Sequence, residues 1–222
     1  MSSRGSAAKR ILPLPSGVSF NDNGNGTRGD LGAVVRAILV DQEALGDFHP
    51  EPTYGHLVEP VLFITRVLRA FHASSDGVLA SFSAGMEQDL FHAASVFNFY
   101  PPGYRIVGGN GLIGPEFKLD DSASALARVN FVNTVVFGSI PPSPPDRPTG
   151  TTLALSQFTA LAAYSQLLVD QFDTLLLHGS MSPAMHDAIE AAVEAIPVSN
   201  VPMRVKTAAY LVASSSQYQV ER

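Results

Sequence analysis

Apolar residues recur at helical spacing along most of this chain, and that periodicity limits the possible folds more than any other feature. In the clearest case, Leu31, Val34 and Ile38 fall on one face of a helix that Asp30 can cap. Strand patterns are almost absent. The sequence therefore predicts an all-α fold, an irregular bundle of about six or seven helices. The further helices are expected as a short segment from residue 88 and over residues 60–73, 122–137, 151–178, 183–196 and 202–212.

The chain is expected to form a single helical domain over residues 19–222, preceded by a flexible leader over residues 1–18. A proline-rich linker over residues 139–149 lies inside that domain. No signal peptide is predicted, because Pro13 and Pro15 interrupt the only candidate apolar run after the early basic residues. No apolar run reaches the length of a membrane span, and the compartment stays undetermined.

Composition narrows the classes of partner. The net charge is −6 and no cluster of Lys or Arg offsets it, which argues against a nucleic-acid partner. Only 15% of the residues are charged, which suggests that part of the surface is covered by a partner or a missing domain. The absence of cysteine excludes disulfides, thiol catalysis and cysteine-based zinc sites.

A long loop rich in aromatic residues, proline and glycine occupies residues 97–114 and is broken by Pro101 and Pro102. Aromatic residues that alternate with proline are typical of surfaces that bind a protein or a polysaccharide, but they also serve to plug a loop into a core. The use of phenylalanine in place of tryptophan favours the plug. If the loop is instead a binding surface, its candidate residues are Phe97, Phe99, Tyr100 and Tyr104.

The segment around Ser83 differs by one residue from the G-x-S-x-G nucleophile elbow, because Ser81 stands at the first glycine position. That elbow also needs a strand before the nucleophile. Ser83 with His92 is a weak candidate nucleophile–base pair for a hydrolase acting on an ester or a polysaccharide. Glu87 with Asp89 is a candidate carboxylate pair, although side chains two residues apart diverge on a helix. The sequence leaves the question of enzymatic activity open.

Two patterns have metal-ligand spacing. Asn21, Asn23 and Asn25 alternate as the ligands of a calcium loop do, but they are amides where carboxylates are expected. Asp89 and His92 would share one helix face, as in di-metal carboxylate bundles, but no second pair repeats their spacing. We therefore predict no metal and no cofactor.

Four segments carry a resemblance to a known family. They are G-T-R-G-D-L-G-A-V-V-R-A-I-L at 26–39, Q-D-L-F-H-A-A-S-V-F-N-F-Y-P-P-G-Y at 88–104, G-P-E-F at 114–117 and A-A-Y-L-V-A-S-S-S-Q-Y-Q-V at 208–220. With these segments the chain resembles the C-terminal part of a large bacterial family, domain of unknown function 1800 (DUF1800).

The resemblance implies a mainly helical protein from an exported family whose members are longer and have no established activity. This chain lacks the export signal and the N-terminal half of that pattern, so it resembles a truncated member. The leading hypothesis is a helical module of unknown function that binds a partner through the 97–114 loop. The alternative is the hydrolase.

Overall fold

The computed structural model describes residues 15–41, 45 and 55–221. Of the expected leader over residues 1–18, residues 1–14 lie outside the described residues, and residues 15–18 belong to a helix. The described residues fall into two compact units, the first comprising residues up to His56 with residues 103–115, and the second comprising residues 57–102 and 116–221. The prediction of a mainly helical protein with only short strands is confirmed.

The first unit contains two paired helices, α1 (Pro15–Asn21) and α2 (Leu31–Leu39). Asp30 caps α2 as predicted, and its side chain accepts a hydrogen bond from the backbone N–H of Ala33 at 3.1 Å. The pKa of Asp30 lies below its usual value, chiefly because the Asn23 side chain donates a hydrogen bond to the carboxylate. No residue of α2 is buried. Residues 103–115 form a separate turn, in which Ile106 and Leu112 pair through their backbones.

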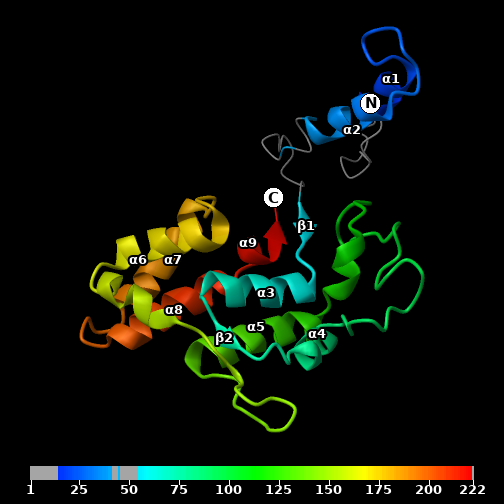
Figure 1. Cartoon of the computed structure of the whole chain (residues 1–222). Helices are drawn as coiled ribbons and strands as arrows, with labels where there is room; N and C mark the ends of the chain where they lie inside the picture. Colours follow the sequence, from blue (N-terminus) through cyan, green and yellow to red (C-terminus); the bar gives the residue numbers. More distant parts are fainter. Residues whose placement is uncertain (1–14, 42–44, 46–54, 222) are drawn as a thin grey trace. The chain divides into compact units, whose positions relative to one another are not determined.

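The second unit is built around α8 (Val201–Ala213), which contacts α5 (Ser122–Phe137), α6 (Ser165–Phe172) and α7 (Pro183–Glu194). Figure 1 shows α3 (Pro60–Ala70) beside α5, and α6 and α7 near α8. Short helices complete the unit: α4 (Ala80–Gly85), the 3-10 helices η2 (Pro115–Leu119) and η3 (Leu155–Leu161), the π-helix η4 (Asp173–Leu177) and α9 (Ser216–Gln219).

Aromatic side chains dominate the core of this unit. Phe158 and Phe172 lie 4.8 Å apart between ring centroids, and Phe71 meets both rings edge-on at 6.0 and 5.8 Å. Phe63 contacts Phe131 in the same way at 6.3 Å. Each such side chain stabilises the fold by about 1.5–3 kcal/mol when it is fully buried. The helices are therefore held by their packed faces.

Two short two-stranded sheets close the fold: β1 (His56–Leu57) with β4 (Val220–Glu221), and β2 (Ser74–Ser75) with β3 (Thr151–Thr152). Residues 140–151 form a closed loop, because Ile140 and Thr151 exchange backbone hydrogen bonds at 2.9 and 2.8 Å. Gly150 has a φ of +70°, and a Cβ there would collide with the carbonyl oxygen of Ile140. The proline-rich linker of the prediction is thus a loop fastened at its own base.

The prediction of one long helix over residues 151–178 is wrong. Thr151 and Thr152 belong to β3, and the rest of the segment is divided among η3, α6 and η4. Pairing of Thr151 with Ile140, and a 2.7 Å contact between the hydroxyls of Thr151 and Ser75, override the helical periodicity. The segment ends at His178, which has a left-handed backbone with a φ of 55°.

The prediction of a short helix from residue 88 is also wrong. The residues from Asp89 to His92 form turns and no helix, and Phe91 has a φ of 67°, which a helix does not allow. No helix among the described residues is both long enough and apolar enough to cross a membrane.

Candidate functional site

Residues Gln88–Tyr100 form a loop whose two ends are tied to the same residue, and we call this segment the clamped loop. At one end, the Gln88 side-chain amide donates a hydrogen bond to Glu59 Oε2, and at the other the Tyr100 hydroxyl donates to Glu59 Oε1 at 2.6 Å. Gln88 is only 2% exposed, and its carbonyl oxygen accepts from the backbone N–H of Val61 at 2.9 Å. One glutamate beside the start of α3 therefore anchors both ends of the loop.

The Tyr100 hydroxyl keeps its proton near neutral pH. Burial raises the pKa of the Tyr100 hydroxyl well above its usual value, and the hydrogen bond to Glu59 raises it further. Because both effects favour the protonated phenol, Tyr100 remains a hydrogen-bond donor to the carboxylate.

Between its two ends the clamped loop holds three large apolar side chains in solvent. Phe91 is 99% exposed, Val96 is 94% exposed and Phe97 is 61% exposed. A turn at Ser95 fixes the backbone beside Phe97, whose N–H donates to the Ser95 hydroxyl at 3.1 Å, while Asn98 has a φ of 71°. The interpretation of this segment as a plug in the core is therefore wrong for Phe97.

The other predicted binding residues are half-buried. Phe99 and Tyr100 lie at the anchored end of the clamped loop. Tyr104 belongs to the first unit, where its carbonyl oxygen accepts from the N–H of Gly114 at 3.0 Å. Sequence reasoning missed Phe91 and Val96, because it assigned residue 91 to a helix and started the loop at residue 97.

The candidate nucleophile does not have the surroundings of one. Ser83 lies on α4, is 1% exposed and donates its hydroxyl proton to the Ala80 carbonyl at 3.0 Å. The side chain of His92 is 75% exposed, and its Nδ1 lies 3.4 Å from Asp89 Oδ2. Within the described ranges no hydrogen bond joins Ser83 to His92. Glu87 lies 3.9 Å from the ammonium group of Lys118.

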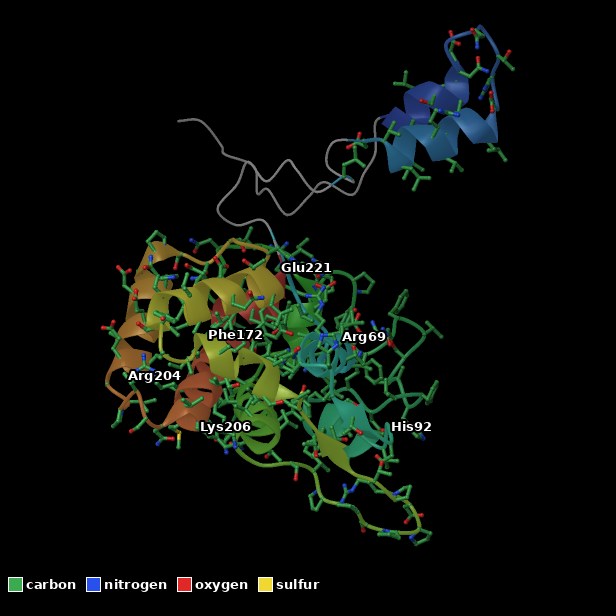
Figure 2. The ribbon with its side chains drawn as sticks, turned by 60° about the vertical axis from the view of Figure 1, so that its left-hand side comes forward. Arg69, His92, Phe172, Arg204, Lys206 and Glu221 are labelled. Atoms are coloured by element: carbon green, nitrogen blue, oxygen red, sulfur yellow. The ribbon has the colours of Figure 1, made fainter. Side chains whose placement is uncertain are left out.

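A cleft of about 340 Å³ lies between α3, α4 and the turn at residues 75–79. Its walls are mostly apolar, and the polar residues Arg69 and Ser83 are also among the residues that line it. Figure 2 labels Arg69 on α3 and His92 on the clamped loop. One residue of the clamped loop, Leu90, contributes to the lining, so the loop and the cleft are neighbours.

Metal-ligating side chains are not gathered at either feature. In the part of the chain that the structure describes, no three His, Asp or Glu residues are grouped as metal ligands would be. In the asparagine-rich loop, Asn23 Oδ1 accepts from the N–H of Asn25 at 2.9 Å, so that oxygen stabilises the loop's own turn.

A comparison with protein families supplies the assignment. The family model described as "Protein of unknown function (DUF1800)" matches residues 18–220, which is nearly the whole chain. The chain belongs to this family. The matched range includes the residues of both the clamped loop and the cleft. No curated protein and no solved structure matches the chain.

Proposed function

We propose that this chain is a non-catalytic helical module of the DUF1800 family that binds a protein partner through the clamped loop. The observation that carries the proposal is the exposure of Phe91, Val96 and Phe97 on a loop whose ends are fixed. Exposed apolar side chains that are gathered on one segment, rather than scattered singly over the surface, mark interaction sites on soluble proteins.

The clamp makes the loop a suitable binding element. Its two ends are joined through Glu59, so the loop is already partly ordered in the free protein. Binding a partner therefore costs less conformational entropy than it would for a loop with free ends. A compact loop with fixed ends and exposed side chains is a common functional element. The structure therefore supports a prepared contact surface.

The exposed side chains favour a protein over a polysaccharide. A sugar-binding surface needs flat rings together with polar groups that bind hydroxyls, whereas Val96 is aliphatic and Phe91 and Phe97 carry no polar atom on their rings. Apolar anchors of this kind match the centres of protein–protein interfaces. The hydrolase hypothesis has no observation in its favour, because the Ser83 hydroxyl is buried and bonded to a backbone carbonyl.

Site-specific photo-crosslinking in the source cells tests the proposal. A photoreactive phenylalanine analogue at position 91 or 97 is expected to give one discrete protein adduct. The same analogue at Leu126, which is 60% exposed on α5, is expected to give none. The proposal fails if positions 91 and 97 give no more adduct than position 126.

A second measurement uses the captured protein. The variant with Phe91→Ser, Val96→Ser and Phe97→Ser is expected to bind it at least tenfold more weakly, since buried apolar anchors carry most of the binding energy. Its thermal stability is expected to match that of the parent, because the replaced side chains are exposed and contribute little to the packing of the core. Unchanged affinity of the folded triple variant would refute the assignment of the surface.

A further inference from the structure

We propose that the cleft beside Arg69 binds a small amphipathic acid, namely an unbranched apolar chain that ends in one carboxylate. The argument for this ligand does not rest on the protein-binding function proposed above. The proposal depends on three properties of the cleft, which are its size, its apolar walls and its one unpaired cation.

The cleft has the size and lining of a small-molecule site. Its volume of about 340 Å³ lies in the range that small ligands occupy in proteins. The walls come from α3, α4 and the loops beside them, so the site lies within one unit. Its apolar lining residues are Val61, Ile64, Leu68, Leu79, Ala80 and Leu90.

The hydroxyl groups of the lining are already bonded inside the protein. Thr65 Oγ1 donates to the Val61 carbonyl at 2.9 Å, and Ser83 Oγ donates to the Ala80 carbonyl at 3.0 Å. Ser75 Oγ lies 2.7 Å from the hydroxyl of Thr151. These groups stabilise their own turns, and a ligand rich in hydroxyls would find few free donors here.

Arg69 is the exception. It is exposed, and over residues 15–41, 45 and 55–221 no carboxylate lies within ion-pair distance of its guanidinium group. By contrast, its neighbour Arg66 on α3 bonds to Glu221 at 2.5 Å. A guanidinium group presents a planar pair of donors that matches a carboxylate. An apolar cleft with one free cation therefore complements a ligand with an apolar chain and one negative charge.

The charge count selects a carboxylate over a phosphate monoester. A phosphate monoester carries about −1.5 to −2 at neutral pH, and its second charge would have no partner at a single arginine. A carboxylate carries one charge, which Arg69 balances. The apolar walls then contribute through the length of the chain, because each buried methylene strengthens binding about fourfold at most.

Titration calorimetry of the whole chain with octanoate, decanoate and dodecanoate tests the proposal. Affinity is expected to rise about tenfold for each added pair of methylenes until the cleft is full. Decyltrimethylammonium, which has a similar tail and the opposite charge, is expected to bind at least tenfold more weakly than decanoate. Equal affinity for the two probes, or no dependence on chain length, would overturn the inference.

Variants distinguish the cleft from adsorption elsewhere. Arg69→Gln is expected to weaken decanoate binding about tenfold, and Arg69→Lys less, because it keeps the charge and loses the paired donors. Ala80→Phe is expected to fill the cleft and abolish binding. Arg36→Gln, which removes the same charge from α2, is the matched control and is expected to bind like the parent.

These outcomes are separate from those of the protein-binding proposal. The triple variant of the clamped loop keeps Leu90 and Arg69, so it is expected to bind decanoate normally. If Arg69→Gln, which changes only an exposed side chain, binds decanoate as tightly as Arg36→Gln does, the cleft is not the site.

Discussion

Two buried arginines in the second unit have opposite surroundings, and replacing each by methionine should change stability in opposite directions. Arg128 of α5 is 0% exposed, and its Nε, Nη1 and Nη2 atoms have no hydrogen-bond partner among the described residues. Its guanidinium carbon lies 5.3 Å from the centre of the Phe63 ring. Arg204 of α8 is 3% exposed, but it donates to the carbonyls of Ala162 at 2.6 Å and Ile196 at 2.7 Å.

The magnitude follows from the contacts of Arg128. Each of its three nitrogens costs at least about 1 kcal/mol when it is buried without a partner. The contact with the Phe63 ring returns about 2 kcal/mol, the value for a desolvated pair of this kind. Burial lowers the pKa of Arg128, and the charge of Asp120 only partly opposes that effect. Arg128→Met, which keeps most of the volume, is therefore expected to raise the free energy of unfolding by about 1 kcal/mol.

Arg204→Met is the matched control. It leaves the carbonyls of Ala162 and Ile196 without their donor, and we expect it to lower the free energy of unfolding by about 2 kcal/mol or more. Urea unfolding followed by circular dichroism measures both changes. In thermal unfolding, each kcal/mol corresponds to about 2–4 °C for a chain of this size. If Arg128→Met destabilises the protein as Arg204→Met does, the reasoning about unpaired buried charge is refuted.

Two further predictions concern the clamp and a helix cap. Glu59→Gln removes the charged acceptor shared by Gln88 and Tyr100, which weakens both hydrogen bonds at the ends of the loop. Protease cleavage between residues 88 and 100 should then become about tenfold faster. An unchanged half-life of the intact chain during proteolysis would contradict the clamp. Asp121 caps α5, and its pKa is lowered chiefly by the hydrogen bond from the Ser124 N–H. A folded-state pKa below the unfolded one means that the ionised cap stabilises the protein above the unfolded pKa and loses this effect as pH falls through the folded pKa. Asp121→Ala should therefore destabilise the protein at neutral pH, and thermal unfolding should show the difference from the parent shrinking in acid; a constant difference would count against the cap.

The helices that sequence reasoning predicted well carry their signals locally. α2 begins after Asp30, α3 begins at Pro60, α5 follows Asp121 and α7 follows Ser182, as expected. In each case a capping side chain or a proline at the first turn marks the start, and apolar spacing marks the face. Such signals need only a few neighbouring residues, so one sequence is enough to find them.

The long segment from residue 151 was mispredicted because its structure is set by distant contacts. Thr151 pairs with Ile140 and contacts Ser75, and neither partner lies within a helical turn of it. The resemblance to the DUF1800 family was confirmed over residues 18–220, whereas the proposed truncation stays a prediction.

Most of the candidate site could not be predicted from the sequence, because contacts between distant residues form it too. The hydrogen bond between Gln88 and Glu59 joins residues that are 29 apart in the sequence, and that between Tyr100 and Glu59 joins residues that are 41 apart. No local sequence pattern indicates either hydrogen bond. The cleft beside Arg69 likewise has no local sequence signal, because α3, α4 and the turn at residues 75–79 form it together. The catalytic candidates Ser83, His92, Glu87 and Asp89 remain without support.

Both ends of the clamped loop are hydrogen-bonded to Glu59. We therefore expect the residues between them to tolerate substitution and insertion without disturbing the core. Lengthening a loop that is closed at its base costs little, since the entropy of closure grows only with the logarithm of its length. A helical protein that carries its contact residues on such a loop could acquire new partners through changes in this one segment, while its core stayed the same.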